Sequence, residues 1–229
     1  AEALASYDVD ISSAQIEETA SYATALWEWN AKINLTRHTE WATFAARDVI
    51  YAWQLARRLE PGESVMDLGS GGGLPGVPIA IARPDLQVTL LEATGKKARF
   101  LTACAQRMPL ANVKVINDRA EVVGRDALHR ERYDAVVCRA VGPLRVLLEY
   151  TLPLAKVGGL VLAMKGPSVE AELDDAGDAL SVLGAGDVQV FDAYPEGFEI
   201  ATVVVSIVKD RRTPRAYPRA PGTAKQQPL

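Results

Sequence analysis

Apolar residues in the first quarter of the chain recur three or four positions apart. From about Ser12 to Leu59 this spacing places them along one face of a helix. The segment 29–36 lies between the two helical stretches, and Pro61-Gly62 ends the pattern with a turn signal. We therefore predict an N-terminal helical cap over residues 1–60, made of two helices and the loop between them.

Beyond residue 60 the pattern changes to short, continuously apolar runs separated by helical stretches. Such runs are typical of parallel strands that are buried on both faces. Alternating strands and helices indicate an α/β fold with a doubly wound, mostly parallel, Rossmann-like sheet over residues 61–210. The predicted strands are 64–68, 87–91, 113–117, 133–138, 160–164 and 202–208, and the predicted helices are 76–82, 96–108, 143–154 and 168–183.

Composition narrows the class of protein. The chain has 229 residues, of which 48% are hydrophobic, so it can bury one sizeable core. Its two cysteines, Cys104 and Cys138, lie in apolar segments, which predicts buried thiols and no disulfide framework or metal site. No apolar run approaches the roughly 18 residues of a membrane span, and acids stand in Ala1–Asp10 where a signal peptide carries bases. We expect a cytoplasmic monomer that does not associate with membranes.

Charge is spread unevenly along the chain. The formal net charge is -4, yet the segment around the predicted tail, residues 211–229, is basic. Such a tail is either simply solvated or contacts a polyanion. Six bases stand against the single acid Asp210 in this part of the chain: Lys209, Arg211, Arg212, Arg215, Arg219 and Lys225.

The strongest chemical signal is the segment Asp67-Leu68-Gly69-Ser70-Gly71-Gly72-Gly73-Leu74-Pro75-Gly76, where the first strand turns into the first helix. Glycines there let the backbone approach a ligand closely. Their spacing also satisfies the dinucleotide fingerprint, so glycines alone do not separate a nicotinamide site from an S-adenosylmethionine site. Asp67 would repel a pyrophosphate but suits a ligand with an ammonium and a sulfonium. The neighbouring residues therefore favour S-adenosylmethionine.

Two further strand ends carry acids. Glu92 ends the second strand, nineteen residues beyond Gly73, where a carboxylate can accept hydrogen bonds from both ribose hydroxyls. Ala120 and Glu121 follow the third strand and could flank an adenine, although Glu121 also suits the start of a helix. The glycine loop and Glu92 together predict an adenosine ligand.

These segments belong to a wider set of motifs that resembles one family over nearly the whole chain. The set comprises Trp29-Asn30, Ile33-Asn34-Leu35-Thr36, Asp67 through Gly76, Gly95-Lys96-Lys97-x-Arg99-Phe100-Leu101, Arg119-Ala120-Glu121, Arg139-Ala140, Leu152-Pro153-Leu154, Lys165-Gly166 and Tyr217-Pro218-Arg219. The chain resembles the RsmG family, also called GidB, of bacterial 16S ribosomal RNA (guanine-N7) methyltransferases.

The resemblance implies a cofactor, a substrate and a set of contacts. The implied substrate is a guanine in the 530 loop of 16S RNA, within the 30S subunit, an assembly intermediate or free RNA. Glu92-Ala93-Thr94 stands where many members have an Asp-Ser pair, which leaves the ribose contacts less defined. The expected S-adenosylmethionine contacts are Gly69, Gly71, Leu74, Glu92, Ala93, Thr94, Ala120, Glu121 and Arg139.

Methylation of guanine N7 requires no general base, because N7 carries an in-plane lone pair and no proton. We therefore expect positioning rather than a general base, with N7 about 3 to 3.5 Å from the methyl group. Arg139, after the fourth strand, could bind guanine O6 or the cofactor carboxylate, or pair with Asp67 or Asp134. Lys165, which ends the fifth strand, could contact a phosphate or base, or snorkel to solvent.

RNA binding is expected to depend on phosphate contacts, from the basic tail and from the bases near the glycine loop, and to weaken as salt rises. The latter bases are Lys96, Lys97 and Arg99. The tryptophans Trp27, Trp29, Trp41 and Trp53 have helical spacing typical of a core, with base stacking expected for about one of them.

Two other functions fit parts of this pattern. A nicotinamide-dependent oxidoreductase would use the same glycine spacing and Glu92, but the sequence offers it no recognisable proton donor. A non-catalytic RNA-binding protein could keep the cofactor fold without turnover, although the intact glycine loop argues against it.

Overall fold

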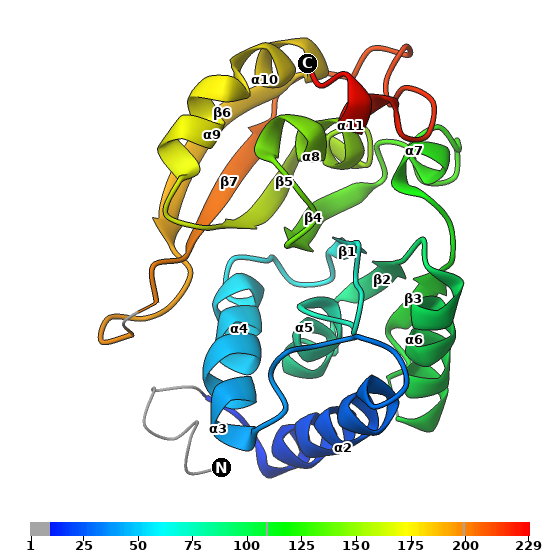
Figure 1. Cartoon of the computed structure of the whole chain (residues 1–229), viewed down its shortest axis with the longest axis vertical. Helices are drawn as coiled ribbons and strands as arrows, with labels where there is room; N and C mark the ends of the chain where they lie inside the picture. Colours follow the sequence, from blue (N-terminus) through cyan, green and yellow to red (C-terminus); the bar gives the residue numbers. More distant parts are fainter. Residues whose placement is uncertain (1–9, 109, 199) are drawn as a thin grey trace.

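The computed structural model describes residues 10–108, 110–198 and 200–229. A single seven-stranded sheet crosses this part of the chain, in the order β3-β2-β1-β4-β5-β7-β6 (Figure 1). Strands β1 to β5 pair in parallel, and β7 lies antiparallel between β5 and β6. The predicted mostly parallel, Rossmann-like α/β fold is confirmed. The strands are β1 (Ser64–Leu68), β2 (Gln87–Leu91), β3 (Val113–Ile116), β4 (Tyr133–Arg139), β5 (Ala155–Lys165), β6 (Ala185–Asp192) and β7 (Val203–Lys209).

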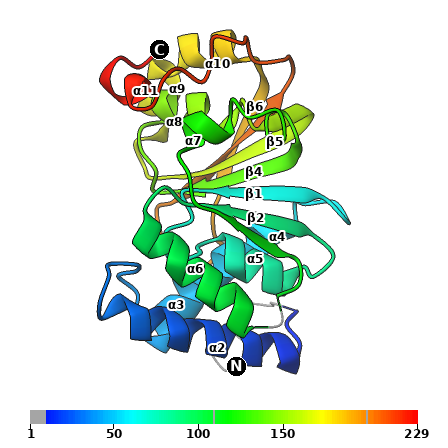
Figure 2. The ribbon, with the colours of Figure 1, turned by 90° about the vertical axis from the view of Figure 1, so that its right-hand side faces the viewer.

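Helices cover the sheet on both faces (Figure 2). One face carries α2 (Ser13–Asn30), α3 (Trp41–Phe44), a π-helical turn (Ala45–Val49), α4 (Ile50–Ala56), α5 (Gly76–Ala82) and α6 (Gly95–Arg107). The other carries α7 (Ala120–Val123), α8 (Leu144–Thr151), α9 (Val169–Asp175), α10 (Gly177–Leu183) and α11 (Thr223–Gln226). Along β1, Val65 packs into the core of the first face and Met66 into that of the second. Strands buried on both faces explain the continuously apolar runs of the sequence.

The N-terminal helices share a core with the sheet. Ser12 caps α2 through a reciprocal capping box with Gln15, whose side-chain amide also donates to the carbonyls of Ile81 and Ala82 at the end of α5. The buried Tyr22 hydroxyl donates to the Gly72 carbonyl at 2.5 Å. These bonds fix the helical cap directly against the glycine loop.

Several elements differ from the sequence prediction, among them the short helices α7 and α11, which were not predicted. Strand β6 was not predicted, because it is an edge strand with mostly half-exposed or exposed residues that include Gly186 and Asp187. The predicted helix 168–183 is divided between α9 and α10 at Ala176. The second helix of the cap contains a π-helical turn at Ala45–Val49. Hydrophobic spacing does not reveal a single inserted residue of this kind.

The basic tail is folded onto the body of the protein rather than simply solvated. The Lys209 ammonium is fully buried and donates to the Glu131 carboxylate at 2.7 Å. The Arg219 guanidinium pairs with Glu149, whose side chain is 1% exposed, at 2.6 Å. Of the six bases counted in this part of the chain, Arg211, Arg212, Arg215 and Lys225 are exposed. Lys209 and Arg219 are instead paired with acids of the body, so neither of the two alternatives for the basic tail describes them.

The described residues also answer the smaller predictions. Cys104 and Cys138 are buried free thiols, as expected. Within the described ranges, no cluster of three or more potential metal ligands is found. No helix in this part of the chain has the length and apolar character needed to cross a membrane. Residues 1–9, most of the acidic segment used to argue against a signal peptide, lie outside the described residues.

Candidate active site

Two pockets open at the carboxyl ends of β1, β2 and β4, where chain order reverses across the sheet. We call the smaller, of about 160 Å³, the strand-end pocket; it is lined by Leu68, Gly69, Leu91, Glu92, Ala93, Asp118, Arg119, Ala120, Glu121, Val141 and Tyr150. We call the larger, of about 560 Å³, the cap pocket; it is lined by Asn34, Leu35, Thr36, Arg37, His38, Gly69, Ser70, Gly71, Gly72, Leu74, Lys97, Arg139 and Ala140. Gly69 is common to both, so a ligand that passes it would reach from one pocket into the other.

The glycine loop is shaped by two kinds of constraint. Gly69 and Gly71 have positive φ angles of 73° and 58°, which glycine adopts at low cost. Gly76 is constrained by space, since a Cβ atom there would lie 2.4 Å from Leu90 Cδ2 and 2.6 Å from Asp67 Oδ2. A Cβ at Gly71 would instead have only the Gly69 carbonyl within 4 Å. The loop is therefore packed tightly at its helix end and open at Gly71, toward the cap pocket.

Asp67 is a buried carboxylate beneath this loop. Its Oδ2 accepts from the backbone N–H of Gly76 at 3.0 Å, whereas its buried Oδ1 has no hydrogen-bond partner in the described chain. Burial raises the pKa of Asp67 to about 7, although the Gly76 and Ser70 hydrogen bonds oppose this rise. A cationic group bound nearby would favour the ionised form.

Glu92 joins the ends of two strands. Its buried carboxylate accepts from the backbone N–H of Gly71 at 2.9 Å and from that of Thr94 at 2.6 Å. Each carboxylate oxygen can accept more than one hydrogen bond, so Glu92 retains capacity for ligand hydroxyls at the wall of the strand-end pocket. Ala93 lines the same pocket, while Thr94 starts α6 and does not line either pocket.

Glu121 connects the strand-end pocket with the tail. Its Oε1 accepts from Arg119 Nη2 and from the backbone N–H of Gly222, both at 2.8 Å. Burial alone would raise the pKa of Glu121, but these hydrogen bonds hold it below its ordinary value. Ala120 and Glu121 both line the pocket, and their contact with an adenine stays a prediction. The bond from Gly222 brings the C-terminal segment to the wall of this pocket.

Arg139 pairs with an acid that sequence reasoning did not identify. Its Nη1 donates at 2.5 Å to Oδ1 of Asp48, a fully buried residue of the π-helical turn. Burial lowers the pKa of Arg139, but the Asp48 charge outweighs it and raises that pKa. An ion pair with a neighbouring carboxylate was one of the alternatives for Arg139, but the acids suggested for it were Asp67 and Asp134. Asp134 accepts from Ser64 and Lys156 instead, and Asp67 accepts from Gly76.

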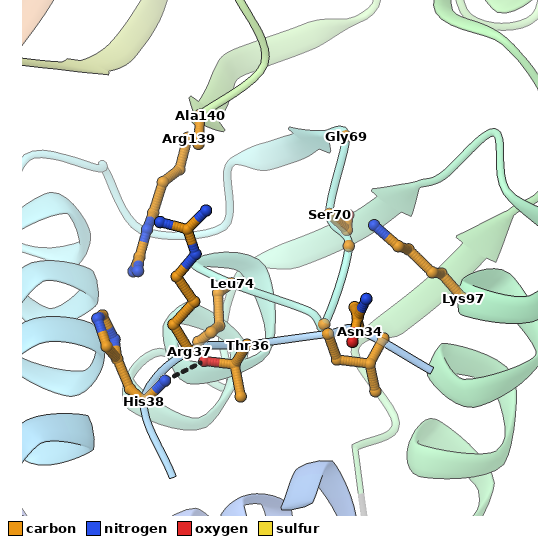
Figure 3. Close-up of a pocket in the computed structure, with 13 residues that line it drawn as sticks. Asn34, Thr36, Arg37, His38, Gly69, Ser70, Leu74, Lys97, Arg139 and Ala140 are labelled. Atoms are coloured by element: carbon orange, nitrogen blue, oxygen red, sulfur yellow. Dashed lines mark hydrogen bonds between the residues drawn. The ribbon is translucent and has the colours of Figure 1, made fainter. Parts of the chain in front are cut away.

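The other carboxylate oxygen of Asp48 binds a histidine of the cap. Asp48 Oδ2 and His38 Nδ1 are 2.8 Å apart. His38 and Arg139 both line the cap pocket, and Figure 3 shows their side chains on the same side of it. Asp48 therefore joins the cap loop to the end of β4.

The cap loop that forms this side of the pocket is held from within. Asn30 Oδ1 accepts from the backbone N–H groups of Leu35 and Thr36, at 2.8 and 3.0 Å. This fixes the loop opposite the glycine loop, with Arg37 at the pocket wall (Figure 3). Lys97, which was expected to contact RNA, lines the pocket from α6.

Lys165 is not brought to either pocket. Its ammonium donates to the Gly142 carbonyl at 2.6 Å and to Glu172 Oε2 at 2.7 Å, and its side chain is nearly buried. The position of Lys165 at a strand end had suggested that it contacts a phosphate or base, or that it snorkels to solvent. It does not snorkel, and it does not line the cap pocket. It holds the loop after β4, in which Ala140 has a positive φ of 55°.

Several lining residues were not identified as site residues from the sequence. Tyr150 and Val141 carry no local signal, because they reach the strand-end pocket from α8 and the loop before it. The Asn-Leu-Thr motif at 34–36 was noticed, but nothing in its spacing indicated that the loop faces Gly71.

Comparisons with known proteins agree with this geometry. The family model for rRNA small subunit methyltransferase G, GidB, matches residues 15–195. Relatives of that name include a Roseiflexus castenholzii protein, 41% identical over 98% of this chain and 96% of the relative. Another, from Symbiobacterium thermophilum, is 42% identical over 100% of this chain and 96% of the relative.

Solved structures share the fold at low sequence identity. A putative S-adenosylmethionine-dependent methyltransferase from Methanococcus maripaludis matches with a TM-score of 0.58 at 13% identity, covering 85% of this chain and 94% of that one. A T. thermophilus 16S rRNA N2 G1207 methyltransferase, in complex with AdoMet and guanosine, matches with a TM-score of 0.50 at 21% identity, covering 73% and 40%. The chain therefore belongs to the rRNA small subunit methyltransferase G (GidB) family and is a methyltransferase with the Rossmann-like fold of S-adenosylmethionine-dependent enzymes.

Proposed function

We propose that the protein uses S-adenosylmethionine to methylate N7 of a guanine in the 530 loop of 16S ribosomal RNA. The observation that carries this proposal is the pair of adjoining pockets that meet at Gly69. The strand-end pocket takes the adenosine of the cofactor, and the cap pocket takes its methionine end together with the acceptor base. The atom and the RNA loop are inferred from the family resemblance.

The residues in and beneath the two pockets fit this cofactor. Asp67 lines neither pocket, but its buried carboxylate lies beneath the glycine loop with Oδ1 unpartnered, where its negative charge favours an ammonium group above the loop. Gly71 leaves space where a side chain would stand. Glu92 accepts hydrogen bonds from the ribose hydroxyls, and Ala120 and Glu121 flank the adenine. When bound, S-adenosylmethionine supplies an electrophilic methyl group. The remaining proposed contacts are Gly69, Leu74, Ala93, Thr94 and Arg139.

The cap pocket fits a nucleic-acid acceptor. Arg37, Lys97 and Arg139 line it, so basic side chains surround a site that a phosphate-flanked base would enter. Trp41, 53% exposed beside the cap loop, is the tryptophan that we assign to base stacking. Because N7 has no proton to lose, the residues need only hold its lone pair in line with the methyl group.

Arg139 and Lys165 have positioning roles in this proposal. Only Nη1 of Arg139 is bonded to Asp48, so its other donors can reach guanine O6 or the cofactor carboxylate. Lys165 does not touch the ligand in this proposal, but its bond to the Gly142 carbonyl fixes the loop that follows Arg139. We propose that the protein acts in the cytoplasm as a monomer, on the 30S subunit or an assembly intermediate.

The test is nucleoside mass mapping of 16S RNA from cells with and without the protein. The proposal expects one 7-methylguanosine of the 530 loop to disappear with the protein and return when it is restored. An unchanged map, in cells that express the protein, would refute the proposed substrate. Titration calorimetry with S-adenosylhomocysteine and NADH tests the cofactor separately, and tight NADH binding without S-adenosylhomocysteine binding would reject it.

A further inference from the structure

We propose that His38 reads the acceptor guanine: its Nε2 accepts the N1–H of the base while Arg139 donates to O6. This inference rests on the proposed function, because it concerns the acceptor end of the same cap pocket. It assigns a guanine-specificity role to a histidine and a buried aspartate of the N-terminal cap.

Asp48 holds the two recognition groups together from outside the pocket. Its side chain is fully buried, and each carboxylate oxygen binds one of them: Oδ1 binds Arg139 at 2.5 Å and Oδ2 binds His38 at 2.8 Å. A buried carboxylate requires such partners, since an unpaired charge there would be strongly destabilising. The π-helical turn that carries Asp48 is a feature often found near functional sites.

The backbone of His38 is fixed as well. Its N–H donates to Thr36 Oγ1 at 3.0 Å, drawn in Figure 3, and its carbonyl accepts from Trp27 Nε1 at 2.8 Å. His38 thus makes three hydrogen bonds, two from its backbone and one from its ring, yet its side chain remains 20% exposed where it lines the cap pocket. Such a ring is oriented before a ligand arrives, which reduces the entropy lost on binding.

The bond to Asp48 also determines which ring nitrogen can accept a hydrogen bond. A carboxylate only accepts hydrogen bonds, so Nδ1 must donate, and the lone pair of a neutral ring then lies on Nε2. Arg139 has only donors. The cap pocket therefore presents an acceptor and a donor group next to each other, each anchored on Asp48.

A donor from Arg139 next to an acceptor from His38 matches the edge of guanine and not that of adenine. Going round the base from N7, guanine presents the acceptor O6 and then the donor N1–H, whereas adenine presents a donor amine and then an acceptor N1. Parallel pairing of Leu68 with Cys138 places Gly69 beside Arg139. His38 and Arg139 share Asp48 as a partner, and Figure 3 shows His38 on the far side of Arg139 from Gly69. A guanine with N7 toward Gly69 would meet Arg139 at O6 and His38 at N1–H.

The same arrangement suits the movement of charge in the reaction. N7 forms a bond to the methyl carbon as the sulfur–carbon bond breaks, so one positive charge moves from sulfur to the purine and no proton is transferred. Asp48 neutralises Arg139, which reduces repulsion between that cation and the methylated base. The positive charge strengthens N1–H as a donor, and therefore strengthens its bond to His38.

The test compares three acceptor bases in 30S subunits reconstituted from ligated 16S RNA. The acceptor position carries guanine, inosine, which keeps O6 and N1–H, or 2-aminopurine, which keeps N7 but lacks both. The full-length protein should methylate guanine and inosine subunits at similar kcat/KM. It should act on 2-aminopurine subunits about 100-fold less well, as expected for the loss of base-edge hydrogen bonds.

Replacing His38 should reduce this discrimination rather than simply reduce activity. In His38→Ala, kcat/KM for guanine should fall about 10- to 100-fold, with a much smaller fall for 2-aminopurine and unchanged affinity for S-adenosylhomocysteine. His38→Gln, whose amide oxygen can accept from N1–H, should recover part of the preference. His129→Ala is the matched control, because His129 stacks on Tyr133 and lines neither pocket.

The outcomes separate this inference from the proposed function. If the wild type methylates guanine subunits and His38→Ala keeps the full guanine preference, the role of His38 is wrong and the proposed function stands. An equal loss on all three bases would mean that His38 is merely structural, which also overturns the inference. If the wild type does not methylate the guanine subunits at the 530 loop, the proposed function itself fails.

Discussion

Arg219 and Glu149 connect the C-terminal segment to the body of the protein. Glu149, on α8, is 1% exposed and accepts from the Arg219 backbone N–H at 2.7 Å and from its guanidinium at 2.6 Å. Three residues further on, the Gly222 N–H binds Glu121 at the strand-end pocket. The tail is therefore part of the support of this pocket as well as a source of positive charge.

Arg219→Ala should destabilise the protein, because it leaves the buried Glu149 carboxylate with only its backbone donor. We expect the free energy of unfolding to fall by about 3 kcal/mol, as for other buried carboxylates that lose their partner. Urea unfolding measures this change. Glu149→Gln combined with Arg219→Ala should recover much of the loss, and Arg215→Ala, at an exposed tail position, is the control. Equal stability of Arg219→Ala and Arg215→Ala would contradict the structural role.

The exposed tail bases should act on RNA alone. The triple variant Arg212→Ala, Arg215→Ala, Lys225→Ala removes charges that are exposed in the structure. RNA affinity should fall, and the slope of log K against log salt should become shallower by about two, since each phosphate contact contributes roughly 0.7 to 0.9. Filter binding over a salt series measures the slope. An unchanged slope would show that these bases do not contact RNA.

The raised pKa of Asp67 should make the stability of the protein fall as pH rises, which is opposite to the effect of a salt-bridged carboxylate. Its pKa is about 7 in the folded protein, against 3.8 for an ordinary aspartate. Below about pH 3 both states are protonated and Asp67 has no effect on stability. As the pH rises from about 3 to 7, the unfolded chain loses the proton that the folded chain keeps, so stability falls, by about 1.4 kcal/mol per pKa unit. Asp67→Asn should therefore be more stable than the wild type at pH 8, and the difference should vanish below about pH 3.

Cofactor binding should change the protonation of Asp67. The ammonium of S-adenosylmethionine favours ionised Asp67, so the wild type should release a proton on binding near pH 7. Calorimetry in buffers of different ionisation enthalpy measures this release. Asp67→Asn should release less and bind more weakly. If both proteins bound with the same proton release, Asp67 would not sense the cofactor.

The parts of the site that the sequence predicted are those encoded by local spacing. The glycine loop, Glu92 and Ala120-Glu121 each follow a recognisable strand, and the carboxyl ends of parallel strands meet at one edge of the sheet. Their placement thus follows from the order of strands and needs no knowledge of side-chain contacts.

The parts that could not be predicted depend on contacts between distant segments. Arg139 was expected at the end of β4, but its partner Asp48 lies 91 residues away in the cap, in a π-helical turn that hydrophobic spacing does not signal. The bond from Gly222 to Glu121 spans 101 residues. Each required the packing of the cap or the tail against the sheet, which no local pattern specifies.

Gly71 and Gly76 should respond differently to the same substitution, because one is open and the other is enclosed. A Cβ at Gly76 would lie 2.4 Å from Leu90 and 2.6 Å from Asp67, so Gly76→Ala should destabilise the protein by about 3 kcal/mol. Gly71→Ala meets space toward the cap pocket and only the strain of a φ of 58°, about 1 kcal/mol. It should fold, yet bind S-adenosylhomocysteine more weakly because its methyl group occupies the ligand's side of the loop. Thermal unfolding and calorimetry distinguish the two effects, and normal affinity in a folded Gly71→Ala would show that the cofactor does not approach this position.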